Sequence, residues 1–264
     1  MATLRSLSPG FDPAVVAGID AKLREVETNH GVRILLAIES GSRGWGFASP
    51  DSDYDCRFIY VRPRDDYLSL FPKRDVIEYP PDGIYDVNGW DLQKALKLLL
   101  KGNAVVIEWL TSPYAYAGDP AFRDELLALA REVVQPAAIA NRYLHLGERQ
   151  YRRSLEGRES VSLKKVFYVL RPAIALRWMR HHPGEAVVPM AFGTLVDESD
   201  LPAEVRPVIG DLLARKDETR ELGEGRLPGL IEAEFGCARE NWPASVPSPA
   251  VTATRQLTSS SGVA

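Results

Sequence analysis

The chain has 264 residues, 45% of them hydrophobic, and a formal net charge of −4, which is typical of a globular protein with a real core and excludes a general basic coat for nucleic acid. Its two cysteines, Cys56 and Cys237, are too few and too far apart for a disulfide framework or a cysteine-based metal cluster. No apolar run is long enough to span a membrane and the N-terminus lacks the apolar segment of a signal peptide, so we expect a cytoplasmic protein without membrane contact.

The first part of the chain predicts a helix followed by a small sheet. Asp12 and Pro13 are typical of a helix start and Gly31 of its end. Runs rich in branched apolar residues then predict four strands, at 33–39, 54–61, 75–79 and 84–89. The last two strands are separated by the short turn "PPDG", which favours an antiparallel hairpin.

The sequence then changes from strand to helical patterns. Asp91 and Gly102 are expected to bound an amphipathic helix, and a shorter helix follows over 104–110. Five further helices are predicted at 121–134, 137–155, 163–181, 202–216 and 230–239.

These elements predict an α+β fold in two domains, 1–118 with the sheet and 119–240 with the helices. The boundary is placed near Gly118 to Pro120, where the strand patterns stop. The remaining residues, 241–264, are rich in proline, serine and threonine with little to bury, so we expect a disordered tail.

The stretch "ESGSRGWGFASPDSDYD", residues 39–55, places glycines beside carboxylates. Gly41 and Ser42 follow a strand, and the amides of a short helix starting there would favour a phosphate. Asp53 and Asp55 project to the same side of the next strand, where their repulsion calls for a cation. Mg²⁺ prefers carboxylate and phosphate oxygens, so a metal would join the two halves of this stretch. Asp51 is explained by turn chemistry.

A third carboxylate is expected on a neighbouring strand. Asp86 is the favoured candidate, because it lies inside a predicted strand where aspartate is otherwise disfavoured. Asp91 is the alternative, although its position before "LQKAL" is explained by helix capping.

The strings "GSRGWG" and "DSDYD" resemble the G-S-x(n)-D-x-D signature of the polymerase-β-like nucleotidyltransferase superfamily, in a bacterial and phage branch sometimes linked with RNA ligases. The resemblance continues more weakly through "DVNGWDLQKALKLLLKGN" and "LKKVFYVLRPAIALRW". It implies a small mixed sheet with a helical domain that closes over the nucleotide. It also implies that Gly41 and Ser42 contact a triphosphate, and that Asp53, Asp55 and Asp86 hold two Mg²⁺ ions.

The helical half has a basic segment with candidate nucleotide contacts. Residues 121–180 carry 12 Lys and Arg against 6 Asp and Glu, which favours an anionic ligand over a solvated helix face only weakly. Lys164, Tyr168 and Arg171 form one helical stripe suited to a triphosphate and a base, with Lys165 as the alternative to Lys164. Tyr168 could instead belong to the core.

A second stripe, Arg142, Arg149 and Arg153, could bind phosphates of an acceptor or pair with nearby glutamates. The leading hypothesis is a nucleotidyltransferase that uses an NTP with Mg²⁺ or Mn²⁺ and an RNA, protein or small-molecule acceptor. The alternative is a non-catalytic nucleotide sensor on the same fold. The sequence specifies neither the base, nor the acceptor, nor the oligomeric state.

Overall fold

The computed structural model describes residues 3–156, 163–216 and 228–242, with the side chains of 163, 164, 215, 216 and 228 excepted. Five strands form one sheet: β1 (Arg33–Glu39), β2 (Tyr54–Val61), β3 (Val76–Glu78), β4 (Tyr85–Asp91) and β5 (Ala115–Gly118). The helices that precede or interleave with these strands are α1 (Pro13–His30), α2 (Gly41–Trp45), α3 (Arg64–Tyr67), α4 (Leu92–Leu100) and α5 (Ala104–Leu110). Those after the sheet are α6 (Pro120–Val133), α7 (Pro136–Ser154), α8 (Leu163–His181), α9 (Phe192–Glu198), α10 (Val205–Lys216) and α11 (Pro228–Asn241).

The sheet is mixed, with the strand order β3-β4-β2-β1-β5. The central pair β2 and β4 is parallel, while the other neighbours are antiparallel. Since β2 and β4 run in the same direction, both begin at the edge of the sheet where β1 ends. The loop that leaves β1 therefore lies beside the first residues of β2 and β4.

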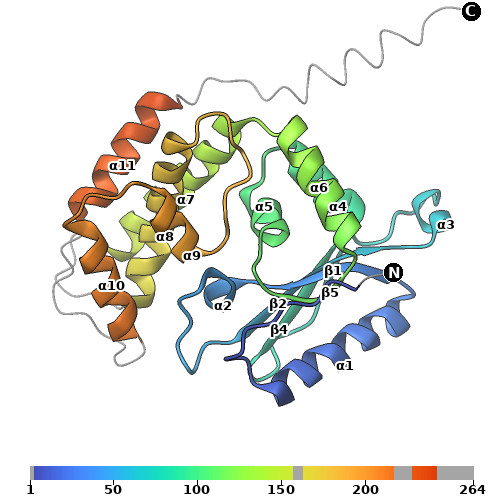
Figure 1. The fold of residues 1–264 in the computed structure, drawn as a ribbon. Helices are drawn as coiled ribbons and strands as arrows, with labels where there is room; N and C mark the ends of the chain where they lie inside the picture. Colours follow the sequence, from blue (N-terminus) through green and yellow to red (C-terminus); the bar gives the residue numbers. More distant parts are fainter. Residues whose placement is uncertain (1–2, 157–162, 217–227, 243–264) are drawn as a thin grey trace, which may run out of the picture.

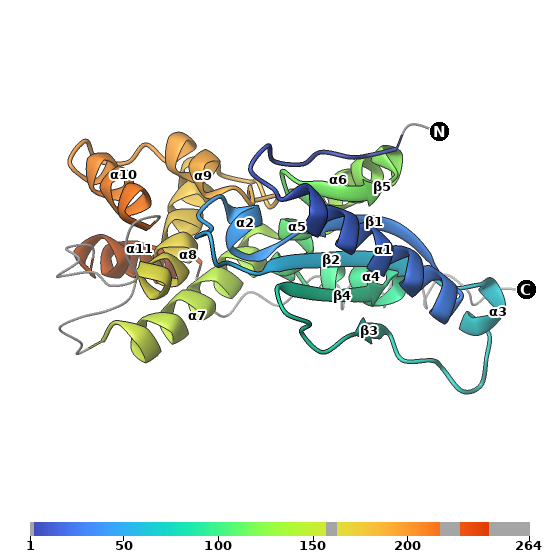
Figure 2. The same cartoon turned by 90° about the horizontal axis from the view of Figure 1, so that it is seen from below.

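Each face of the sheet is covered by its own hydrophobic cluster. Helix α1 packs on one face, where its apolar stripe meets Cys56, Phe58 and Tyr60 of β2. Helices α4 and α5 cover the other face, where Ile59 joins their buried residues. Figures 1 and 2 show α1 on one side of the sheet and α4 and α5 on the other.

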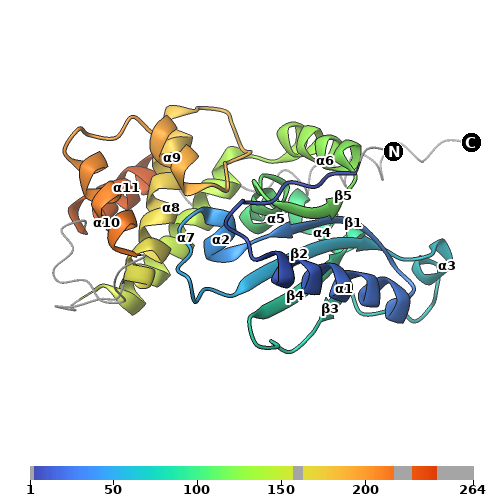
Figure 3. The same ribbon diagram turned by 60° about the horizontal axis from the view of Figure 1, so that its bottom comes forward.

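The second cluster does not end with the sheet. It continues from α4 and α5 into α6, α7, α8, α9 and α11. Figure 3 shows α7, α8, α9 and α11 together on the side of α2 away from the sheet, whereas α6 lies beside β5. Helix α6 lies after the predicted boundary near Gly118 but packs against β1, α4 and α5. The division into 1–118 and 119–240 stays a prediction.

Most predicted elements are confirmed, and so is the α+β class. Asp12 accepts a hydrogen bond from the amide of Ala14 and caps α1, and Asp91 caps α4 in the same way through Gln93. The sequence patterns missed β5, α3 and α9, because these short segments carry no clear periodic signal of their own. Helix α8 runs through Pro172, although proline has no amide hydrogen to donate to the carbonyl of the preceding turn.

Two further expectations concern the membrane and the tail. No helix in the described ranges is long and apolar enough to cross a membrane. The predicted disordered tail, apart from its first two residues, lies outside the described residues.

Candidate active site

Asp55 and Asp86 lie side by side where β2 and β4 begin. They are paired residues in the parallel register of these strands, and their side chains share the sheet face of α4 and α5 because Cys56 and Val87 face α1. Asp91 is paired with Tyr60, five positions further along, which is about 16 Å away at the usual rise of a strand. The structure thus brings Asp86 to Asp55 and places Asp91 at the other end of β4.

Arg57 lies between the two carboxylates. Its Nη2 donates to Asp86 Oδ2 at 2.6 Å and to Asp55 Oδ1 at 3.2 Å. Asn88, two residues along β4, donates to Asp86 Oδ1 at 2.5 Å. Burial raises the pKa of Asp55 to about 6, with the Arg57 guanidinium acting against burial and the charge of Asp86 acting with it. The pair is therefore held in place by donors that also offset its repulsion.

The fit of this site to a metal ion is partial. Hard carboxylate oxygens on neighbouring strands are the donor type that Mg²⁺ takes. Within the residues that the structure describes, however, no three histidine, cysteine or carboxylate side chains are gathered closely enough to hold an ion. Asp53 is exposed before β2 begins, and Arg57 stands between Asp55 and Asp86. A metal shared by these carboxylates requires Arg57 to withdraw.

Helix α2 begins directly against this pair. Gly41 has φ +56°, and a Cβ placed there would lie 1.9 Å from Asp55 Oδ2. Glycine is thus needed both for the left-handed backbone and for the approach of the carboxylate. Ser40 does not cap the helix with its side chain, so the first-turn amides of Gly41 and Ser42 have no acceptor within the helix. The hydroxyl of Ser42 belongs to a buried side chain.

Arg43 fixes the loop that carries Asp53. Its guanidinium donates to the carbonyl oxygens of Ser52 at 2.7 Å and of Asp53 at 3.1 Å, and stacks 3.9 Å over the ring of Tyr54. These contacts tie α2 to the start of β2. They leave the Asp53 side chain exposed beside Asp55, whose pKa its negative charge raises further.

Glu39 is a buried carboxyl behind Asp55. It ends β1 with no exposed surface, and its Oε1 accepts the amide of Asp55 at 3.0 Å. Its Oε2 accepts the hydroxyl of Tyr116 on β5. Burial raises the pKa of Glu39 to about 8, against the opposing effect of these two hydrogen bonds. Glu39 thus positions the backbone of Asp55. The sequence patterns did not predict this role, although a charged residue at the end of an apolar strand could have indicated it.

Tyr168 of α8 extends the site into the helical half. Burial raises the pKa of its phenol, and the negative charges of Asp55 and Asp53 raise it further. Its ring meets that of Trp45, at the end of α2, edge-on with 5.5 Å between centroids. The aromatic pair thus connects α2, next to the carboxylates, with α8.

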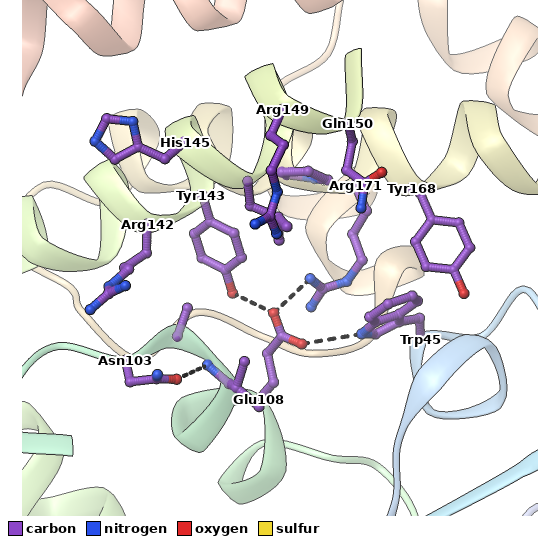
Figure 4. A pocket seen from close by; sticks show the side chains of 14 residues that line it. Trp45, Asn103, Glu108, Arg142, Tyr143, His145, Arg149, Gln150, Tyr168 and Arg171 are labelled. Atoms are coloured by element: carbon purple, nitrogen blue, oxygen red, sulfur yellow. Dashed lines mark hydrogen bonds and ion pairs between the residues drawn. The ribbon is translucent and has the colours of Figure 1, made fainter. Parts of the chain in front are cut away.

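Arg171, one helical turn further on, is buried in an ion pair. Its Nη1 donates to Glu108 Oε1 of α5 at 2.8 Å, and the same carboxylate accepts Tyr143 at 3.0 Å and Trp45 at 3.3 Å (Figure 4). Its Nη2 donates to the carbonyl of Met190 at 3.1 Å. The positive charge predicted to meet a triphosphate is therefore already balanced inside the protein.

The remaining predicted contacts of α8 lie at its start. The side chain of Lys164 lies outside the described residues, and Lys165, the alternative, is exposed. Lys164, Tyr168 and Arg171 keep their predicted spacing on α8. The negative charges of Asp55 and Asp53 act on Tyr168, whereas Arg171 is paired with Glu108.

The sequence of the chain resembles those of known proteins. A family model described as "RNA repair pathway DNA polymerase beta family" matches residues 16–255. An uncharacterized protein of Bacillus subtilis (strain 168), YcgL, is 40% identical over 218 residues, which cover 81% of this chain and 83% of that protein. The matched region includes the sheet, α2 and the described helices that follow.

Proposed function

Because the chain belongs to the RNA repair pathway DNA polymerase beta family, we propose that it is a metal-dependent nucleotidyltransferase. It transfers a nucleoside monophosphate from an NTP to a hydroxyl acceptor. A bond forms between the acceptor oxygen and the α-phosphorus, the bond from that phosphorus to the β-phosphate oxygen breaks, and pyrophosphate leaves. The hydroxyl proton passes to solvent or a nearby base.

The observation that carries the proposal is the meeting of the start of α2 with a carboxylate pair. Gly41, the first residue of α2, lies directly against Asp55, which is paired with Asp86, and the first-turn amides of Gly41 and Ser42 have no acceptor within the helix. Backbone amides bind anions and carboxylates bind Mg²⁺, so the two together suit a triphosphate that carries Mg²⁺.

In this proposal two groups of residues have different roles, one binding phosphates and the other binding the metal. The amides of Gly41 and Ser42 hold the leaving phosphates, while Asp53, Asp55 and Asp86 would hold Mg²⁺, with Mn²⁺ as a substitute. When bound, the metal supplies positive charge that offsets the charge developing on the attacking and leaving oxygens. Arg57 withdraws from between Asp55 and Asp86 to admit it.

The position of Arg57 also favours a second candidate, a non-catalytic nucleotide sensor. A guanidinium that already neutralises Asp55 and Asp86 would leave the site able to bind a nucleotide without a metal. Calorimetry with an NTP in the presence of EDTA separates the two, since the sensor binds at full affinity and the enzyme does not.

The test of transfer uses NTPs labelled at the α-phosphate, Mg²⁺ or Mn²⁺, and acceptors that begin with RNA ends, as the family description suggests. Asp53→Asn and Asp86→Asn are expected to lower transfer at least 100-fold while the melting temperature stays within a few degrees. Asp51→Asn, in the same loop at the same two-residue spacing, is the matched control. Equal rates for the Asp86 and Asp51 variants would refute the assignment of Asp86.

A further inference from the structure

A pocket of about 480 Å³ lies between α2, α5, α7 and α8, apart from the carboxylate pair. Its walls are largely apolar or aromatic, and its charged lining residues are mostly arginines. The lining includes Trp45, Glu108, Arg142, Tyr143, Arg149 and Tyr168. Its volume is within the range of small-molecule sites, roughly 300–1,000 Å³.

The charge of the pocket is unbalanced. Among the described residues, Glu108 is the one carboxylate in its lining, and Arg171 already neutralises it. Arg142 and Arg149 of α7 are exposed and have no hydrogen bond or ion pair with any residue in the described ranges. Two arginines that face one cavity with no internal counter-charge favour an anionic ligand, and their planar groups suit a phosphate.

The rest of the lining suits a planar ring. Trp45, Tyr143 and Tyr168 supply three aromatic side chains. Trp45 and Tyr143 each donate a hydrogen bond to Glu108, and Tyr168 meets the ring of Trp45 edge-on. Figure 4 shows Trp45 and Tyr168 on one side of the pocket and Arg142 on the opposite side. Aromatic side chains next to cations form the usual surface for stacked bases and their phosphates.

The pocket is connected to the carboxylate site through shared residues. Trp45 ends the helix that begins at Gly41, and the ring of Tyr168 meets that of Trp45 edge-on. A ligand in the pocket and an NTP at the carboxylates would therefore meet at this aromatic pair. The arginines lie on α7, away from the first turn of α2 that would hold the donor's phosphates.

We propose, resting on the function proposed above, that this pocket binds a nucleotide of the acceptor. One nucleoside monophosphate unit places its phosphate on Arg142 and Arg149 and its base against the aromatic wall. The same chemistry is offered by a single-stranded RNA end and by a free nucleotide, and the experiment separates these two sources.

The experiment measures binding of a short, fluorescein-labelled single-stranded RNA by anisotropy, without NTP or added metal, at several salt concentrations. The double variant Arg142→Gln/Arg149→Gln is expected to bind the RNA roughly 10- to 100-fold more weakly. Its slope of log affinity against log salt should be smaller by about 0.7, the value for one lost phosphate contact on a single strand. Both side chains are exposed, so folding is expected to be unaffected, and circular dichroism checks this.

The matched control is Arg152→Gln, an exposed arginine on the same helix that does not line this pocket. It is expected to leave RNA affinity and the salt slope unchanged. NTP binding with Mg²⁺, measured by calorimetry, is expected to stay within twofold for both variants. A double variant that binds RNA like the wild type, or that loses NTP binding instead, would overturn the proposal.

Competition with a nucleoside monophosphate identifies the source. Displacement of the RNA at equal concentrations of phosphate groups assigns a free nucleotide to the pocket, and lack of displacement assigns the strand end. RNA binding is measured without NTP and so does not depend on transfer. Loss of RNA binding in the double variant therefore supports the proposed role of the pocket even when no transfer is detected. If the double variant transfers to RNA, or to an acidic peptide, at an unchanged rate, the proposed role of the pocket is refuted while the proposed nucleotidyltransferase activity stands.

Discussion

Replacing Gly41 by alanine tests the approach of Asp55 to the start of α2. The new Cβ would lie 1.9 Å from Asp55 Oδ2, whereas real Cβ atoms keep at least 3.0 Å, so the carboxylate must move by about 1.1 Å. A displacement of this size at a reacting centre lowers the rate by about 100-fold. The left-handed backbone adds a stability loss of about 1–2 kcal/mol, because Gly41 has φ +56°.

Gly46→Ala is the matched control at the other end of the same helix. Gly46 has φ +89°, and a Cβ there meets nothing within 4 Å, so it carries the backbone strain without the contact. Urea denaturation should give similar stability losses for the two variants, while metal-dependent NTP binding and transfer should fall in Gly41→Ala alone. Equal NTP binding and transfer in the two variants would refute the reasoning, since strain would then explain the whole effect.

Two further predictions concern buried charges. The pKa of Glu39 is raised to about 8, so the folded state keeps a proton that the unfolded state loses, and stability should fall as pH rises from about 4.5 to 8, by at most about 1.4 kcal/mol per pH unit. Denaturation of Glu39→Gln over this range should lack that component, and parallel pH profiles for the variant and the wild type would contradict it. Glu108→Ala should lower the free energy of unfolding by about 3–5 kcal/mol, because it leaves Arg171 buried without its partner. Glu108→Ala/Arg171→Met should recover part of that loss in the same urea experiment, and no recovery would mean that packing rather than charge is responsible.

The elements predicted correctly are those with a strong local signal. The strands at 33–39 and 54–61 carry runs of branched apolar residues, and Asp12 and Asp91 are caps that act within their own helix turn. The strand β5 was missed because its residues, Ala115–Gly118, gain their pairing from β1, far away in the sequence. A four-residue segment has too few positions for a pattern of its own.

The candidate site divides in the same way. Gly41 and Asp55 were predicted to belong to one site from their spacing along one stretch, and the structure places them against each other. The preference for Asp86 over Asp91 agrees with the structure's placement beside Asp55, which depends on the parallel register of β2 and β4. Arg57 was missed, because an arginine inside a strand has no distinguishing pattern until two carboxylates are brought to it.

The sequence by itself determined the local elements and the glycine–carboxylate stretch, because caps, periodicity and residue spacing act over a few neighbouring residues. Tertiary structure alone decided that Arg57 lies between Asp55 and Asp86, and that Arg171 is balanced by Glu108. It also decided that Arg142 and Arg149 face a pocket with no such partner in the described residues. Whether an arginine is neutralised or left for a ligand depends on which distant carboxylate packs against it, and that is set by how the helices pack on one another and on the sheet.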